Sequence, residues 1–324
     1  MGMVYAGLVG DVGGTHARFA LVDGEGHLRH AKTYACADYG ALDEIISAYL
    51  TETTARKRPA KAVIAVAGPV VDGEIEFTNL DWQVSETELI AAFGFEAIKL
   101  VNDFAGQAMA APVLDPADLR RIGPDLAGSP ACPIVVLGPG TGFGVAAVAR
   151  SAHVDIAVAT EAGHTGFAPH DAVEAEVWRR LQAVHGRVSV ERVLSGQGLY
   201  DLYVALEDMA GRTPTHTNER GLIEAGAAGE AGAGAALDRF CAILGGVAGD
   251  LALTYGARGG VYVGGGIPPR MVERLMSGGF RARFEAKGRL APYVRNIPTF
   301  LITHPFPALV GCARELAQLE GVRL

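Results

Sequence analysis

The sequence predicts an α/β protein made of two domains, each with a sheet that opens on a hairpin. Its 324 residues are more than a single typical domain needs. Predicted strands alternate with predicted helices, and a pattern of strand, glycine-rich turn and strand near the N-terminus returns after residue 133. This repetition indicates a duplicated fold. Hydrophobic residues make up 49% of the chain and charged residues 20%, which favours a packed core over disorder.

The N-terminal part of the chain alternates between strand and helix patterns. A glycine-rich turn at residues 10–15 joins two apolar runs and predicts a hairpin. The spacing of apolar residues between Leu42 and Leu50 predicts a helix, and Ser85 with Glu88 predicts a capping box. The expected strands are residues 4–10, 17–23, 28–34, 61–67 and 98–101, and the expected helices are residues 41–54, 85–93 and 105–111.

Residues 112–133 are rich in proline, glycine and charge, which predicts a crossover between domains. We therefore expect a small α/β domain of residues 1–112 with 304–324, and a large α/β domain of residues 113–303. Residues 224–236 are rich in glycine and alanine, and we favour a turn between two packed helices over a flexible linker. The remaining expected strands are residues 134–137, 145–149, 260–263 and 299–303, and the remaining helices are residues 172–184, 198–210, 217–227, 234–255 and 308–319.

Charge and cysteine content narrow the class of protein. The formal net charge is −8, which argues against nucleic acid and membrane surfaces as partners. The N-terminus lacks the basic start of a signal peptide, and no run of about 18 apolar residues predicts a membrane span. The scattered cysteines predict neither a zinc site nor a disulfide framework, and they favour reduced thiols in a cytoplasmic protein. These cysteines are Cys36, Cys132, Cys241 and Cys312.

The first of three glycine-rich turns predicts a phosphate site. Adjacent glycines permit positive φ angles and let backbone N–H groups approach an anion. Thr15 adds a hydroxyl, and Asp11 adds a carboxylate suited to Mg²⁺, directly or through water. An ordinary hairpin turn is the alternative. The residues expected to bind a nucleotide here are Gly10, Asp11, Val12, Gly13, Gly14 and Thr15.

Two further glycine clusters complete the predicted nucleotide site. The second turn, residues 138–144, is expected to close around the other side of the phosphates, and the third, residues 259–266, to receive the adenosine. Tight packing of a strand against a helix is the alternative for the third cluster. The chain contains no P-loop sequence, and neither of the first two turns opens a helix within a βαβ unit, which disfavours a Rossmann site. The residues expected to contact the nucleotide are Gly138, Gly140, Thr141, Gly142, Gly265 and Gly266.

In this order the three turns resemble the phosphate-1, phosphate-2 and adenosine motifs of the actin–hexokinase–Hsp70 ATPase superfamily. The resemblance implies two RNase H-like domains of the actin/hexokinase ATPase fold, with ATP in an interdomain cleft. It does not choose a reaction, because switches and chaperones share the same turns.

Polar residues elsewhere indicate a polyol substrate. Asn102 and Asp103 follow a predicted strand, and the carboxyl ends of strands are where α/β sheets present ligand groups. We expect Asp103 to accept a proton from a substrate hydroxyl and Asn102 to fix the sugar, with a helix N-cap as the equally supported alternative. Glu161 and His164 lie about one turn apart, and Glu191 adds another carboxylate. A core histidine and a surface carboxylate are the alternatives for these positions.

Eight segments together resemble the bacterial-type, non-ROK glucokinase family. They follow the order and spacing of that family over nearly the whole chain. The resemblance implies a cytoplasmic, glycolytic homodimer that converts ATP and D-glucose into ADP and glucose 6-phosphate with Mg²⁺. The segments are VGDVGGTHARFAL, AVAGPVVDG, TNLDW, VNDFAGQAMA, GPGTGFG, TEAGH, SVERVLSG and GGVYVGGGIPPR.

The same resemblance implies a role for each site residue. Asp103 matches the catalytic base of in-line phosphoryl transfer to the 6-hydroxyl. His16 and Ala162 depart from the common family pattern beside ligand positions, so mannose or glucosamine stays open as an alternative substrate. The residues that match or neighbour the family's glucose ligands are Asn79, Asn102, Asp103, Glu161, His164 and Glu191.

Two other function classes remain open. A non-kinase ATPase switch of the actin–Hsp70 type would share the glycine turns but would not need the polyol residues. A sugar-binding regulator, as some ROK relatives are, would add a helix-turn-helix ahead of Val4, for which we expect no room. The chain also lacks the cysteine-rich zinc motif that ROK kinases carry after the position of His164.

Overall fold

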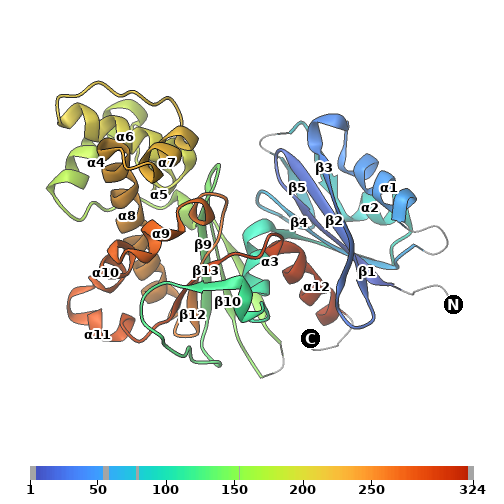
Figure 1. Ribbon diagram of the computed structural model, residues 1–324. Helices are drawn as coiled ribbons and strands as arrows, with labels where there is room; N and C mark the ends of the chain where they lie inside the picture. Colours follow the sequence, from blue (N-terminus) through green and yellow to red (C-terminus); the bar gives the residue numbers. More distant parts are fainter. Residues whose placement is uncertain (1–4, 54–57, 78–79, 153, 320–324) are drawn as a thin grey trace. The chain divides into compact units, whose positions relative to one another are not determined.

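The computed structural model describes residues 5–53, 58–77, 80–152 and 154–319 (Figure 1). The chain forms two compact units. The first consists of Met1–Asp115, Ser151–Ala159 and His304–Leu324, and the second of Pro116–Arg150 and Thr160–Thr303. Relative to the predicted domains, residues 113–115 and 151–159 therefore lie in the first unit.

A buried ion pair explains why residues 151–159 lie in the first unit. Arg314, on helix α12 (Pro307–Leu319), donates to the carboxylate of Asp155, and both side chains are buried. Arg314 also donates to the carbonyl of Met109 (3.0 Å), and the Asp155 N–H donates to the Gln318 side chain (3.1 Å). Sequence patterns gave no sign of this pairing because its partners lie far apart along the chain.

The first unit contains a sheet with strand order β3-β2-β1-β4-β7. Strands β1 and β2 form the predicted hairpin, which is confirmed, and β4 and β7 run parallel to β1. Side chains alternate between two cores, one on each face of this sheet. The strands are β1 (Tyr5–Val12), β2 (His16–Asp23), β3 (Leu28–Ala35), β4 (Lys61–Val66) and β7 (Ala97–Asn102), with a small separate ladder of β5 (Glu74–Glu76) and β6 (Gln83–Ser85).

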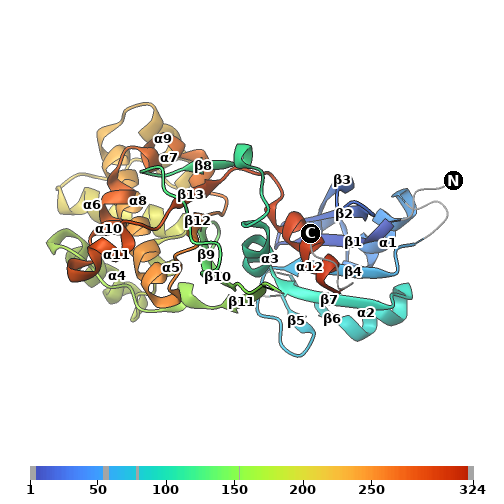
Figure 2. The same ribbon diagram turned by 90° about the horizontal axis from the view of Figure 1, so that it is seen from below.

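Helices cover both faces of this sheet. Helix α1 (Leu42–Thr53) packs its predicted apolar stripe into the core on one face. Helices α3 (Asp103–Ala110) and α12 lie side by side on the other face (Figure 1, Figure 2). They approach closely because Gly311 faces the Gly106 carbonyl, where a Cβ atom would lie only 1.7 Å from the oxygen.

The predicted capping box of helix α2 (Glu86–Phe93) is wrong, although the helix itself is confirmed. Ser85 belongs to β6, and its side chain makes no capping hydrogen bond. The backbone carbonyl of Gly73 instead accepts the first helical N–H, from Glu86 (3.0 Å). Strand pairing therefore replaces the side-chain cap.

The second unit repeats the same arrangement of strands. Strands β10, β9, β12, β13 and β8 follow one another in its sheet; β9 and β10 form a hairpin, and β12 and β13 run parallel to β9. The short strand β8 pairs antiparallel with β13 and was not predicted. The strands are β8 (Leu119–Arg121), β9 (Ile134–Pro139), β10 (Phe143–Ala149), β12 (Gly260–Val263) and β13 (Thr299–Ile302), and β11 (Ile156–Thr160) leads to Glu161.

The long helix α8 (Ala231–Tyr255) is central to the helical part of the second unit. It contacts α6, α7, α9, α10 and α11 and packs against β9 and β12. Only three residues separate α7 from α8, which confirms the predicted tight turn. The other helices are α4 (Ala172–His185), α5 (Val190–Val193), α6 (Gly196–Met209), α7 (Glu219–Ala227), α9 (Val272–Met276), α10 (Gly279–Glu285) and α11 (Ala291–Val294). No helix in the described part of the chain is both long and apolar enough to cross a membrane.

Candidate active site

The first glycine turn is shorter than predicted. Strand β1 extends to Val12, which pairs with Ala17 of β2, so only Gly13, Gly14 and Thr15 remain in the turn. The extension follows from the parallel pairing of β1 with β4, which continues to Val12. Gly13 does not adopt a positive φ, and a Cβ there would lie 3.7 Å from its nearest neighbour atom, the His16 carbonyl oxygen. The absence of a side chain at Gly13 therefore leaves the backbone open, and no unusual dihedral angle requires glycine there.

Gly10, by contrast, is a packing glycine. A Cβ at this position would lie 2.7 Å from the ring of Phe19 and 3.0 Å from Ile64. Val12 is buried in the core. Gly10 and Val12 were predicted to contact the nucleotide, and in the structure they pack within strand β1, which leads into the turn.

Two cysteines hold the ends of this turn, and the sequence gave no sign of them. Cys36 donates its N–H to the Thr15 carbonyl (2.9 Å) and its thiol to the Gly13 carbonyl (3.4 Å). Cys312 of α12 donates its thiol to the Gly10 carbonyl (3.5 Å). Burial raises the pKa of both thiols, so they stay protonated and act as donors.

Asp11 pairs across the hairpin with Arg18. The Arg18 Nη1 atom lies 3.2 Å from Asp11 Oδ2, as expected for directly opposed residues of β1 and β2. Burial raises the pKa of the Asp11 carboxyl above its ordinary value, and the Arg18 guanidinium opposes that rise. The register of the predicted hairpin was the signal that could have identified Arg18.

Asn102 and Asp103 lie where strand β7 ends and helix α3 begins. The Asn102 Oδ1 atom accepts the N–H groups of Phe104 (3.0 Å) and Ala105 (3.2 Å), so the predicted N-cap role is present. Its Nδ2 atom donates one hydrogen to the Gly68 carbonyl (3.2 Å), and an amide nitrogen has a second hydrogen available. The Asp103 carboxylate accepts the N–H of Phe104 (2.9 Å) at the positive end of the helix.

The first turn and Asp103 lie at the same edge of the first unit's sheet. Val66 of β4 is the register partner of both Val12 and Asn102. The ends of β1 and β7 are therefore two strand spacings apart, roughly 10 Å. Asn79, the other residue predicted near the sugar in this unit, lies outside the described residues.

The second and third glycine clusters meet in the second unit. Strands β9 and β12 are neighbours, and a Cβ on Gly138 would lie 2.3 Å from the Gly264 carbonyl oxygen. Gly265 has a φ of 82° and lies against the Pro139 carbonyl. Gly138 and Gly265 therefore pack backbone against backbone where β9 meets the end of β12, which is not the strand–helix packing considered as the alternative for the third cluster. A Cβ on Gly266 would meet nothing within 4 Å.

The turn between β9 and β10 contains Gly140, Thr141 and Gly142. The Gly140 N–H donates to the Gly142 carbonyl (2.8 Å), and the Gly140 carbonyl accepts the N–H of Gly196 at the start of α6 (2.9 Å). Thr141 is exposed at the tip, as Thr15 is in the first unit.

Glu161, His164 and Glu191 form a polar cluster beside this turn. His164 lies between the two carboxylates, with Nε2 4.0 Å from Glu161 and Nδ1 4.0 Å from Glu191. Glu191 also accepts the N–H of Phe143 (2.9 Å), and a Cβ on Gly142 would come within 2.6 Å of its carboxylate. Ser189 caps helix α5 and fixes the start of the helix that carries Glu191. Acceptors on both sides of an imidazole are suited to neighbouring sugar hydroxyls.

Fold and site together define a class of protein. Both units have the hairpin and parallel strands expected of the actin/hexokinase ATPase fold, with a glycine turn at one edge of each sheet. A carboxylate lies beside the turn edge in the first unit, and a carboxylate–imidazole–carboxylate cluster lies beside the turn in the second. This combination is that of a sugar kinase.

Comparison with known proteins identifies the family. The glucokinase family model matches residues 8–319, and the curated glucokinase of Caulobacter sp. (strain K31) is 49% identical over 310 residues, covering 95% of this chain and 94% of that protein. The crystal structure of a glucokinase from an Antarctic psychrotroph has a TM-score of 0.87 and 38% identity, covering 96% of this chain and 98% of that one. The chain belongs to the glucokinase family, and the predicted enzyme class is confirmed.

A more distant structure bears on the fold alone. The ROK family glucokinase from Streptomyces griseus, in complex with glucose and AMPPNP, has a TM-score of 0.65 and 18% identity, covering 98% of this chain and 100% of that one. With the psychrotroph glucokinase, it confirms the predicted α/β fold class.

Proposed function

We propose that this glucokinase transfers the γ-phosphoryl group of ATP directly to the 6-hydroxyl of D-glucose, with Asp103 as the general base. The observation that carries the proposal is the position of Asp103 at the first turn of α3, on the same sheet edge as the turn after β1. The Phe104 N–H donates to one oxygen of the Asp103 carboxylate and fixes its orientation, and a carboxylate held in this way can act as the base that accepts the substrate proton. Phosphoryl transfer needs mainly this kind of positioning.

Each unit contains polar residues that were predicted to bind the sugar. The remaining Nδ2 hydrogen of Asn102 is available to a sugar oxygen, and Asn79 stays a predicted ligand. Glu161 and Glu191 can accept hydrogen bonds from neighbouring hydroxyls, while His164 lies between them. His16 and Ala162 do not enter this set of ligands, so the substitutions at these positions leave the proposed contacts intact.

The nucleotide is proposed to contact the glycine turns. The open backbone at Gly13 and the exposed hydroxyls of Thr15 and Thr141 are suited to phosphate oxygens. The open space at Gly266 is suited to the nucleoside part of ATP. The interdomain cleft expected from the superfamily resemblance stays a prediction.

Mg²⁺ fits the residues of the first turn. Among the described residues no group of three or more His, Cys, Asp or Glu side chains converges on a metal position. A Mg²⁺ ion that arrives with a nucleotide does not need one, because phosphates, waters and one carboxylate complete its shell. Asp11 is the residue that would hold it, directly or through water, and the bound ion would neutralise charge on the transferring phosphate.

We further propose a cytoplasmic homodimer that uses ATP as its donor. The four cysteines are free in the structure, as suits a reducing compartment. Light scattering on the purified chain measures the oligomeric state. A coupled assay of ADP release over glucose, mannose, fructose, glucosamine and N-acetylmannosamine measures the selectivity, and exchange of ATP for polyphosphate or ADP tests the donor.

The assignment of Asp103 is tested by substituting it with asparagine. We expect Asp103→Asn to lower kcat by at least about 10²-fold, because the amide cannot take the hydroxyl proton. Circular dichroism and thermal unfolding should stay unchanged. Asp43→Asn, on the exposed start of α1, is the matched control and should keep normal turnover. Near-normal kcat in Asp103→Asn would remove Asp103 from the base role.

A further inference from the structure

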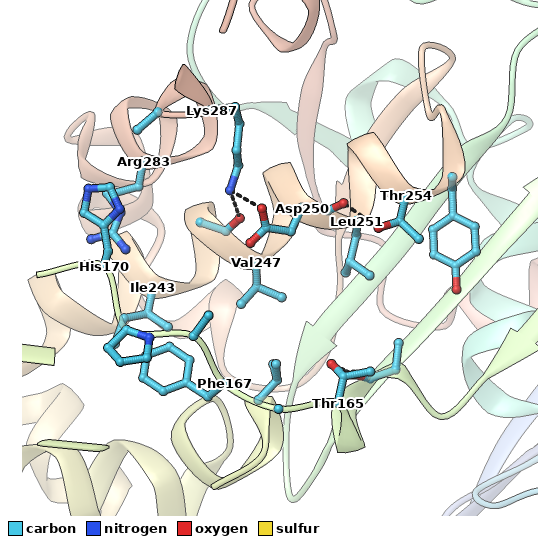
Figure 3. Close-up of a pocket in the computed structure, with 18 residues that line it drawn as sticks. Thr165, Phe167, His170, Ile243, Val247, Asp250, Leu251, Thr254, Arg283 and Lys287 are labelled. Carbon is cyan, nitrogen blue, oxygen red and sulfur yellow. Dashed lines mark hydrogen bonds and ion pairs between the residues drawn. The ribbon is translucent and has the colours of Figure 1, made fainter. Parts of the chain in front are cut away.

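The second unit contains a cavity of about 500 Å³ that the proposed reaction does not use (Figure 3). One wall is the loop from Ala162 to His170, and the opposite walls are the C-terminal part of α8 and the end of α10. In Figure 3, Val247 projects from α8 into the space above Thr165 and Phe167. This volume lies within the range of small-molecule sites.

The loop wall is the back of the proposed sugar site. Ala162 and Thr165 line the cavity and flank the short turn that ends at His164. Val190 also lines it and directly precedes Glu191. The Val190 N–H donates to the Thr165 carbonyl (2.9 Å), which ties the two segments together. A molecule in the cavity therefore touches both segments that carry the carboxylate–imidazole–carboxylate cluster.

The charged groups around the cavity are already paired. Lys287 donates to Asp250 (2.6 Å) and to the Gly246 carbonyl (2.7 Å), as the dashed lines in Figure 3 mark. Arg283 donates twice to the fully buried Glu174 (2.8 and 3.2 Å). Paired charges offer little attraction to a charged ligand, whereas the floor of Phe167, Ile243, Val247 and Leu251 is apolar. An uncharged, flat and largely apolar ligand fits best.

Three hydroxyls line the cavity, those of Thr165, Thr254 and Tyr255, and the two threonine hydroxyls already donate within the protein. Thr165 donates its hydroxyl hydrogen to the Ala162 carbonyl (2.8 Å), and Thr254 donates its own to the Asp250 carbonyl (2.8 Å). Their remaining capacity is to accept hydrogen bonds. The ligand should therefore carry a donor such as a phenolic hydroxyl.

We propose that this cavity is a regulatory site for an uncharged aromatic molecule with a hydroxyl donor, and that its occupation raises the affinity for glucose. The inference rests on the proposed role of Glu161, His164 and Glu191 as sugar ligands. These three residues lie together in the structure. A ligand that braces the loop and the start of α5 stabilises this arrangement, which lowers the cost of ordering the cluster when glucose binds.

The probe is 2-naphthol, and 2-methoxynaphthalene, which lacks the donor, is its matched control. We expect 2-naphthol to bind the full-length protein in calorimetric titration and to lower the glucose KM by at least about fivefold. Because coupling is reciprocal, saturating glucose should tighten 2-naphthol binding by the same factor that glucose affinity gains. The methoxy compound should bind at least about fivefold more weakly, since it leaves an acceptor unpaired.

Variants locate the site. Ala286→Trp covers the rim from an exposed position, Val247→Phe fills the interior, and both should abolish binding of 2-naphthol while leaving kcat unchanged. Ala282→Trp, on the exposed surface of α10 outside the cavity, is the control and should keep both binding and coupling. Thermal unfolding checks that each variant is folded.

Several outcomes would overturn the inference: no binding of 2-naphthol, binding that survives both cavity variants, equal binding of the methoxy compound, or binding without a change in glucose KM. A change of oligomeric state in Ala286→Trp would also overturn it, because a second copy of the chain would then cover the cavity. Different results would contradict the proposed function: an absence of glucose-dependent turnover, or a normal kcat in the Asp103→Asn variant.

Discussion

The two units share one strand arrangement, and the glycines near its hairpin have two different roles. In both, a hairpin is followed by two strands parallel to its first strand, and an exposed threonine lies at the hairpin tip. In the first unit Gly13 leaves its backbone open, whereas in the second Gly138 is packed against the backbone of Gly264. Gly10 in the first unit is also packed, against Phe19, and Gly140 in the second is open, so each motif combines a packed strand glycine with an open turn glycine. The comparison teaches that a glycine motif identifies a fold before it identifies contacts.

Alanine at the two kinds of glycine tests this contrast most strongly. We expect Gly138→Ala to lower the free energy of unfolding by about 3 kcal/mol or more, because backbone atoms of Gly264 cannot rotate away. Gly13→Ala should cost less than about 1 kcal/mol and act mainly on the KM for ATP. Urea unfolding measures the free energies of unfolding, and steady-state kinetics measures the KM for ATP. Equal losses of stability would mean that the two glycines have the same role.

Glutamine at the two carboxylates beside His164 tests how the second unit couples sugar to nucleotide. Hydrogen bonds to charged groups are worth about 1.5–3 kcal/mol, so Glu191→Gln and Glu161→Gln should each raise the glucose KM by about tenfold or more. Only Glu191 also holds the Phe143 N–H, next to the second turn, so only Glu191→Gln should raise the KM for ATP. Steady-state kinetics, with glucose and ATP each varied in turn, measures both KM values. An unchanged ATP KM in Glu191→Gln would contradict the coupling.

The thiol of Cys36 tests how the first turn is held. Removing the thiol donor to the Gly13 carbonyl in Cys36→Ala should raise the ATP KM about threefold, since a typical hydrogen bond contributes about 0.5–1.5 kcal/mol. Cys36→Ser supplies a hydroxyl donor and should recover part of the loss. Cys132→Ser, in the second unit, is the control. An ATP KM that is the same in all three variants and in the unsubstituted protein would show that the turn does not need the Cys36 hydrogen bond.

The ion pair of Asp11 with Arg18 gives the smallest expected effect, a shift in pH dependence. The pKa of Asp11 is already raised by burial, and Arg18 is the group that lowers it, so Arg18→Gln should raise that pKa further. The ionised carboxylate is then lost at a higher pH as the solution is acidified. The acid limb of kcat/KM for MgATP should move to higher pH, while the alkaline limb stays in place. A pH–rate profile with an unmoved acid limb would contradict the ionised role of Asp11.

Segments with a clear apolar pattern could be predicted from the sequence, including the four-residue strands β12 and β13, whereas several short segments without such a pattern could not. The apolar stripe of α1 and the β1–β2 hairpin carry their own local pattern, and both were found. Strand β8 has three residues and exists because β13 offers it a partner, so no local signal predicts it. The helices α9 and α11, of five and four residues, are likewise set by packing.

The candidate site divides in the same way. Its chemical residues stood out by type and spacing, and the structure brings Glu161, His164 and Glu191 together. Asn102 could not be decided from the sequence, because the same side chain serves as an N-cap and keeps one donor free. The contacts of Cys36 and Cys312 with the first turn join segments that are distant along the chain, which no local pattern reveals.

Helix α12 has a consequence for how the chain is made. It packs on one face of the first sheet, where Gly7 lies against Leu316 and Cys312 donates to the Gly10 carbonyl, yet in the sequence it follows the whole second unit. The segment around Asp155, its buried partner, emerges only midway. During synthesis the second unit can therefore complete its core first. The first unit cannot cover this apolar sheet face until helix α12 has also been synthesised.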